Sequence, residues 1–230
     1  MGMFVRRLRV MAAFFGTAVA VAGCMPYGTA DFNLERLPGW YRYLSGDDIK
    51  AACDAGGPDV ARFVYNARWT EQVRAYELRA TDYGAKIDQW VWGPGGLLAA
   101  TPAGPEIRAK TAQVGIDQAR LARLRAAMTA SDVGGKPPKG QFLRSDNFYW
   151  VVAACSQGRF HFNAFQAGDP RFDALTFPRE LFDADRTEVT VNMPRSLDLP
   201  PLAAGRGDDD GPKPFTVQVG ENGLDVARWD

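Results

Sequence analysis

Two periodicities divide the chain that follows its N-terminal segment. Apolar and polar residues alternate over 60–66 and again over 72–79, which is typical of two strands joined as a hairpin. Residues 86–92 predict a third strand and 107–114 a weaker fourth. Over 116–128 the period changes to that of an amphipathic helix. The apolar side of this helix comprises Leu121, Leu124 and Met128.

The segment 148–165 carries the most specific pattern. Gln157-Gly158 fits a two-residue hairpin turn. Such a turn pairs residues across the two strands on one shared face, and both faces are largely apolar, so we expect a central hairpin covered on both sides. The predicted pairs are Cys155 with Phe160, Ala153 with Phe162, and Val151 with Ala164. The opposite face collects Trp150, Val152, Ala154, His161, Asn163 and Phe165.

A short helix is predicted ahead of the first strand. Ser45, followed three residues later by Asp48, resembles a capping box. The helix is expected to run over 47–54, and its spacing turns Cys53 toward the interior.

The last third of the chain predicts strands on either side of a loop. Residues 188–193 are expected to form a strand, whereas 194–214 are rich in Pro, Gly and Asp and predict a loop. Residues 215–219 alternate cleanly and return through 224–226 as a hairpin. These patterns together predict a single α+β domain over 39–230, with a mainly antiparallel sheet of about six to nine strands and two principal helices.

The N-terminal segment has a different character. A basic stretch precedes an apolar run over 10–22, which suits the core of a signal peptide but is short for a membrane span. The run ends in Val21-Ala22-Gly23-Cys24, which resembles the lipobox of bacterial lipoprotein signal peptides. Residues beside the paired arginines fit a twin-arginine signal poorly, which favours the general secretory route. The basic stretch contains Arg6, Arg7 and Arg9.

This resemblance implies a signal peptide over 1–23 and a lipid anchor. Cleavage would leave Cys24 as the first residue, diacylated on its sulfur, and two or three acyl chains hold a protein stably at a membrane. Met25 stands where inner-membrane retention in many Gram-negative bacteria favours aspartate. The resemblance therefore implies the inner leaflet of the outer membrane, facing the periplasm, with 24–38 as a tether. The alternative is an uncleaved anchor or a signal peptide cut at another small residue.

Composition and charge limit the function classes. With 46% hydrophobic and 23% charged residues, the chain resembles a globular protein rather than a disordered chain, a fibre or a multi-span membrane protein. The 27 basic residues balance 27 acidic ones, so no electrostatic basis for nucleic-acid binding exists. Loss of the basic signal segment would leave a slightly acidic chain without a polybasic patch.

Two cysteines remain after the predicted cleavage, Cys53 and Cys155. In an oxidising compartment such a pair is typical of a disulfide, which would close a loop of about a hundred residues and stabilise the fold by about 2–4 kcal/mol. The helix over 47–54 would then pack on the hairpin face that carries Val151. The alternative is a reactive thiol at Cys155 with His161 as its base.

No catalytic motif accompanies these features. The sequence contains no H-E-x-x-H, C-x-x-C, nucleophile elbow, P-loop or dinucleotide-binding glycine motif. His161 is the only histidine, and its place among aromatic strand residues is typical of a structural hydrogen-bonding group. We therefore expect neither a metal nor another cofactor.

Three groups of carboxylates each have two interpretations, one functional and one structural. Asp208-Asp209-Asp210 offers oxygen ligands to Ca²⁺, but consecutive side chains point in different directions, which favours a solvated loop. Asp47 with Asp48, and Asp183 with Asp185, would suit a glycosidase pair. Each pair is more typical of a helix start or a turn.

Aromatic residues supply the leading binding hypothesis. Trp90 and Trp92 lie two apart on one predicted strand and therefore share a face. With Tyr76 or Trp69 from a neighbouring strand they would form a platform for a sugar or a peptide. The alternative is burial beneath the helix over 116–128. That helix also carries a basic stripe suited to lipid headgroups or peptidoglycan carboxylates. The stripe comprises Arg120, Arg123 and Arg125.

The sequence thus favours a lipid-anchored periplasmic module without catalytic activity, whose partner is an envelope protein or an envelope component such as peptidoglycan. The alternative is a small envelope hydrolase, which a pocket holding His161 beside a carboxylate or Ser156 would favour. A third hypothesis is a structural spacer or assembly factor in an envelope complex.

Overall fold

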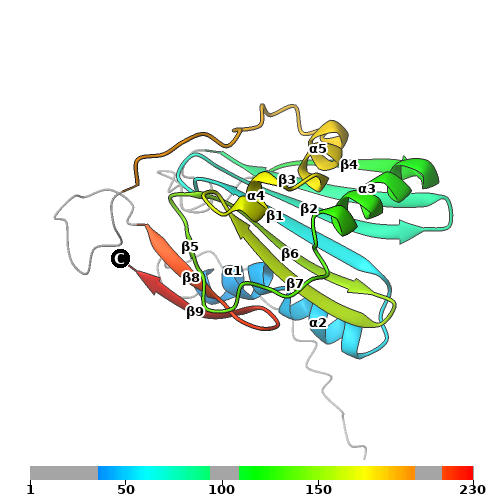
Figure 1. The fold of residues 1–230 in the computed structure, drawn as a ribbon. Coiled ribbons are helices and arrows are strands. Elements are labelled where there is room, and N and C mark those ends of the chain that lie inside the picture. The colour runs from blue at the N-terminus through cyan, green and yellow to red at the C-terminus, as the bar shows by residue number, and fades with distance from the viewer. Residues whose placement is uncertain (1–35, 94–108, 200–213, 230) are drawn as a thin grey trace, which may run out of the picture.

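Antiparallel strands form the centre of the protein, as the computed structural model shows for residues 36–93, 109–199 and 214–229 (Figure 1). The strands are β1 (Val60–Ala67), β2 (Gln72–Thr81), β3 (Gly84–Trp92), β4 (Lys110–Asp117), β5 (Phe142–Arg144), β6 (Phe148–Ser156), β7 (Arg159–Gln166), β8 (Phe215–Val219) and β9 (Leu224–Trp229). The helices are α1 (Arg36–Ser45), α2 (Asp47–Asp54), α3 (Gln118–Ala130), α4 (Pro170–Asp173) and α5 (Phe177–Ala184). The predicted α+β class is confirmed, although the described residues form five helices rather than two principal ones.

The larger sheet has the strand order β4-β3-β2-β1-β6-β7 and is covered on both faces, while β5, β8 and β9 form a smaller sheet (Figure 1). Helices α3, α4 and α5 lie on one face, which we call the α3 face. Helices α1 and α2 and the small sheet cover the other, the α2 face. Along β1, Phe63 and Tyr65 point to the α3 face and Val64 to the α2 face, and all three are buried.

The predicted pairs of the 148–165 hairpin are confirmed. Cys155 pairs with Phe160, Ala153 with Phe162, and Val151 with Ala164, as expected. Gln157 and Gly158 both have positive φ, 52° and 70°, which is the backbone of the predicted two-residue turn. The hairpin is covered on both faces, but β7 is an edge strand, so the expected central position holds for β6 alone.

The disulfide is also as predicted. Cys53 of α2 is bonded to Cys155 of β6, with 5.5 Å between their Cα atoms and 102 residues between them in sequence. Helix α2 packs on the face of β6 that carries Val151. Because the Cys155 sulfur is bonded, the alternative of a reactive thiol paired with His161 is wrong for this structure.

The helix predicted over 47–54 is confirmed as α2, but its predicted cap is wrong, and the start of the next helix is shifted. Ser45 does not cap α2: its Oγ accepts a hydrogen bond from the Leu224 N–H (3.1 Å), and Gly46 precedes the helix with a φ of 72°. Ile116 belongs to β4 rather than to the following helix. Helix α3 begins instead after Asp117, whose side chain accepts the Arg120 N–H at 2.7 Å, a common way to satisfy a free amide at a helix start.

The strand predicted over 188–193 is absent. The segment crosses the sheet in an extended form, but side chains of β2 rather than a neighbouring backbone bind it. Gln72 donates to the Thr190 carbonyl and accepts the Asn192 N–H, and the Arg74 guanidinium donates to the Val189 carbonyl. Val191 packs on the core without joining a ladder, so the alternation over this segment resembles that of a strand.

Three helices, α1, α4 and α5, have no counterpart among the predictions. α1 begins inside the predicted tether, and α5 places Phe177, Leu181 and Ala184 in the core at helical spacing. The predicted signal peptide, Cys24 and most of the tether lie outside the described residues, as do positions 200–213 of the predicted loop. None of the described helices is long and apolar enough to cross a membrane.

Candidate functional site

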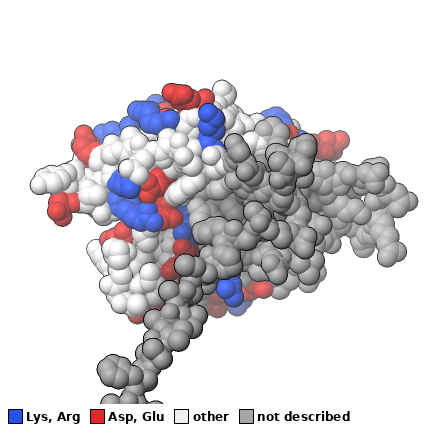
Figure 2. Space-filling model, turned by 180° about the vertical axis from the view of Figure 1, so that it is seen from behind, with Lys and Arg blue, Asp and Glu red and all other residues white. Residues whose placement is uncertain are grey.

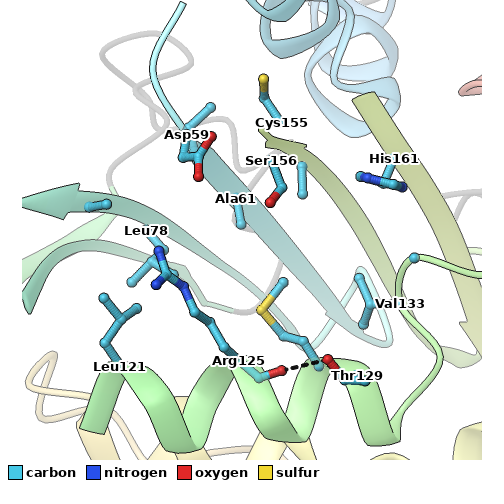
Figure 3. Close-up of a pocket in the computed structure, with 15 residues that line it drawn as sticks. Asp59, Ala61, Leu78, Leu121, Arg125, Thr129, Val133, Cys155, Ser156 and His161 are labelled. Atoms are coloured by element: carbon cyan, nitrogen blue, oxygen red, sulfur yellow. Dashed lines mark hydrogen bonds between the residues drawn. The ribbon is translucent and has the colours of Figure 1, made fainter. Parts of the chain in front are cut away.

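A cavity of about 330 Å³ lies between α3 and one end of the larger sheet, on the α3 face (Figure 3). Its floor consists of short side chains on three neighbouring strands, Ala80 of β2, Ala61 of β1 and Ala154 of β6. Leu121 and Met128 of α3 form the roof. Ala61 pairs with Ala154, and Ala80 lies two residues beyond Leu78, the partner of Ala61 on β2. Because an alanine ends at its Cβ, these positions leave a space that the helix above does not fill.

Three polar side chains surround this space from adjacent strands. Val60 pairs with Cys155, which places Asp59, just ahead of β1, next to Ser156 at the end of β6. On the far side of β6, His161 of β7 pairs with Ala154. The order across the sheet is therefore Asp59, Ser156, His161, and all three residues line the cavity (Figure 3). The expected face for His161 is confirmed.

The polar groups of the pocket have few partners. One carboxylate oxygen of Asp59 accepts the Gln157 N–H at 2.8 Å. The side chains of Ser156, His161 and Arg125 form no hydrogen bond or ion pair with any other described residue. His161 is half-buried, whereas Ser156 and Arg125 are exposed, so all three side chains are available to a ligand.

The arrangement does not fit a Ser-His-Asp hydrolase. Such a site needs the histidine between the nucleophile and the carboxylate, because the imidazole takes the proton from one and is oriented by the other. Here Ser156 lies between Asp59 and His161. The Cys155 sulfur is bonded to Cys53, and no group of three or more metal-ligating side chains occurs in the part of the chain that the structure describes.

The proposed aromatic platform is divided between the two faces of the sheet. Tyr76 pairs with Gln89, so it points away from the face shared by Trp90 and Trp92. Tyr76 is fully buried, and its hydroxyl donates to Asp185 at 2.7 Å. Including Tyr76 in the platform is therefore wrong. The register of β2 against β3 caused the error, because a shift of one residue exchanges the faces.

The two tryptophans lie on the α2 face, opposite to the helix expected to cover them. Both are half-buried, and Trp40 of α1 contacts Trp92 edge to face, with 5.8 Å between ring centroids. Trp69, the other proposed member, is buried against Phe215 at 5.5 Å. Burial under α3 is therefore wrong, and α1 is the helix that packs beside Trp92.

The arginine stripe of α3 does not act as a unit. Arg125 lines the pocket, whereas Arg123 lies 3.8 Å from the Glu180 carboxylate of α5. On the opposite side of the molecule, Figure 2 shows basic and acidic side chains intermingled on the described surface rather than a patch of one sign. The structure therefore offers a single arginine, not a basic stripe, to a bound molecule at this site.

The paired aspartates have separate structural roles. Asp48 binds Arg62 at 2.6 Å, and Asp185 binds the fully buried Arg74, while Asp183 lies on the surface. Neither pair forms the two facing carboxylates of a glycosidase. Asp208–Asp210, considered for Ca²⁺, lie outside the described residues.

Asp185 is held in its charged form. Burial alone raises the pKa of its carboxyl group, but hydrogen bonds from Thr187 and Tyr76 and the charge of Arg74 outweigh burial and hold the pKa below its ordinary value. Burial and the neighbouring carboxylate raise the pKa of Tyr76. This cluster is saturated with partners and serves the fold.

Asp59 is a pocket residue that the pattern of the sequence did not single out, whereas Arg125 was predicted only as part of the basic stripe over 116–128. Asp59 lies in a turn, and Arg125 resembles any exposed arginine of a surface helix. The one available signal is the set of small residues at inward positions, Ala61 and Ala154. Comparison with family models, with curated proteins and with solved structures found no match for this chain.

Proposed function

We propose that this protein is a lipid-anchored lipoprotein of the bacterial envelope that binds a small envelope component in the pocket beneath α3 without transforming it. The N-terminal resemblance to a lipobox supports the anchor at Cys24 and the periplasmic side of the outer membrane. The pocket supports the binding activity.

The observation that carries this proposal is the chemistry of the pocket. Its floor and roof are apolar, and at its edge stand Ser156, His161 and Arg125, whose side chains bond to no other described residue. Its volume is at the lower end of the range of small-molecule sites, which hold a ligand through apolar contact and orient it with a few polar groups. A peptide or glycan fragment small enough to enter is therefore a better occupant than a folded protein domain.

The anchor is tested by metabolic labelling with radioactive palmitate. The wild-type chain should incorporate label and fractionate with outer membranes, whereas Cys24→Ala should do neither. Unlabelled wild-type protein would contradict the lipoprotein assignment.

The pocket is tested by native mass spectrometry of the purified full-length chain. We expect a bound small molecule that is lost when Ala61→Leu fills the floor. Ala126→Leu, an exposed position of α3, is the matched control and should retain the ligand. A ligand that survives Ala61→Leu would place binding elsewhere, and in-cell crosslinking would then identify a protein partner.

A small envelope hydrolase is the second candidate, because Ser156 and His161 line the same pocket. Its weakness is the order of the three polar residues across the sheet. Hydrolysis of chromogenic esters and amides by the wild-type chain, abolished in both Ser156→Ala and His161→Ala with stability retained, would establish it. We expect no activity above that of the two variants.

A further inference from the structure

The pocket carries one charge of each sign on facing elements. Asp59 approaches from the start of β1, and Arg125 approaches from α3. Figure 3 shows the Arg125 guanidinium reaching toward the sheet on the same side of the pocket as the Asp59 carboxylate, with His161 on the opposite side. Oppositely charged groups therefore flank one end of the cavity.

Both charges have unused bonding capacity. Asp59 accepts the Gln157 N–H with Oδ1, and its Oδ2 has no partner among the described residues. The Arg125 guanidinium has five N–H donors and bonds to none of the described carboxylates, Asp59 included. Two nearby charges that do not pair with each other can each take a separate group of one ligand.

We propose that the ligand is a zwitterion with an apolar side chain, that is, a free apolar α-amino acid. This inference rests on the proposed binding function and narrows its ligand from a small envelope component to a single amino acid. The ammonium group is placed at the Asp59 carboxylate and the α-carboxylate at the Arg125 guanidinium. The side chain extends over Ala61 and Ala154 beneath Met128.

Charge balance favours a zwitterion over a ligand of one sign. A purely anionic head would bind Arg125 but would face the Asp59 carboxylate, and a purely cationic head would face Arg125. Each brings two like charges next to each other, which costs binding free energy. An ammonium and a carboxylate on one carbon neutralise both groups, and the alanine floor accepts the apolar remainder.

Isothermal titration calorimetry on the full-length lipidated chain in phospholipid nanodiscs tests this assignment. The first probes are alanine, leucine and phenylalanine, and at least one should bind. The tightest binder is then compared with its N-acetyl form, which lacks the ammonium, and its amide form, which lacks the carboxylate. Each modification should weaken binding at least about tenfold, because each removes a hydrogen bond to a charged group.

Two variants assign each group to its partner. Asp59→Asn, which retains an acceptor for the Gln157 N–H, should abolish the preference over the N-acetyl form only. Arg125→Gln should abolish the preference over the amide form only. Arg123→Gln, on the same helix but outside the pocket, is the control and should bind as wild type.

The outcomes separate this inference from the proposed function. If no amino acid binds, or if both variants keep the wild-type preferences, the zwitterion assignment is overturned. A co-purified ligand lost in Ala61→Leu would nevertheless uphold the pocket as a binding site. If that variant also changes nothing, both proposals fail.

Discussion

The two ends of the α3 face contrast in how they are filled. At one end large aromatic side chains meet: Tyr65 stacks on Trp150 with 4.7 Å between ring centroids, and Phe182 of α5 packs on both rings. At the other end Ala61 and Ala154 occupy the equivalent inward positions and leave a cavity. The strands and the face are the same, so side-chain size alone decides which end encloses space.

The polar groups of the two ends differ in the same way. At the aromatic end, Arg74 is fully buried and bonds to Asp185, Gln72 and the Val189 carbonyl. At the pocket end, His161 and Arg125 bond to no described side chain. A saturated polar network stabilises a fold, whereas unsaturated groups beside a cavity indicate a place for a ligand.

The largest expected effect comes from opening the filled end. Trp150→Ala removes a fully buried indole and should lower the free energy of unfolding by about 4 kcal/mol, because the surrounding rings cannot close the cavity. Met128→Ala, at the roof of the existing pocket, should cost much less. Urea denaturation measures both, and equal losses would remove the distinction between the two ends.

The next largest loss of unfolding free energy is expected from breaking the network of Arg74 and Asp185, and this loss depends on pH. Asp185→Asn leaves Arg74 buried without a counter-charge and should cost about 3 kcal/mol at pH 7. Because the pKa of Asp185 is lowered in the fold, its contribution is present above the ordinary carboxyl pKa and is lost as pH falls through the folded value.

The difference between this variant and wild type should therefore shrink in acid, below about pH 4. Asp183→Asn, two residues away on the surface, is the matched control and should change little at either pH. A constant difference from pH 7 to pH 3 would show that the charge of Asp185 does not contribute.

Local signals account for what the sequence predicted. The Gln157-Gly158 turn fixes the register of β6 and β7, and the cysteine pair then places α2. The register of β2 against β3 is set by a two-residue turn at Asp82 and Tyr83, which was not predicted from the sequence, so the face of Tyr76 was predicted wrongly. The segment over 188–193 alternates like a strand, yet β2 side chains bind it. The pocket forms only where three strands and α3 pack together, so the pattern of any single segment does not predict it.

Two matched substitutions on β1 compare the filled end and the pocket end of the α3 face, with a smaller expected change in stability. Ala61 and Ala67 lie on the same face of the same strand, one at each end. Ala67→Leu forces three carbons into a filled core and should cost about 2 kcal/mol, whereas Ala61→Leu enters the pocket and should cost nearly nothing. Thermal unfolding of the two variants checks this order, and a reversal would mean that the cavity is not open to a side chain.

The smallest expected effect concerns His161. Its imidazole bonds to no described residue, so His161→Ala should change the free energy of unfolding by less than about 0.5 kcal/mol, in the range of surface substitutions. Asn163, two residues along the same strand, is a suitable comparison because its amide donates to the Asp132 carbonyl at 2.9 Å. Asn163→Ala should cost more, since it leaves buried backbone groups unpaired. If His161→Ala proves the more damaging of the two, the histidine is a structural group, and the pocket loses one of the polar side chains available to a ligand.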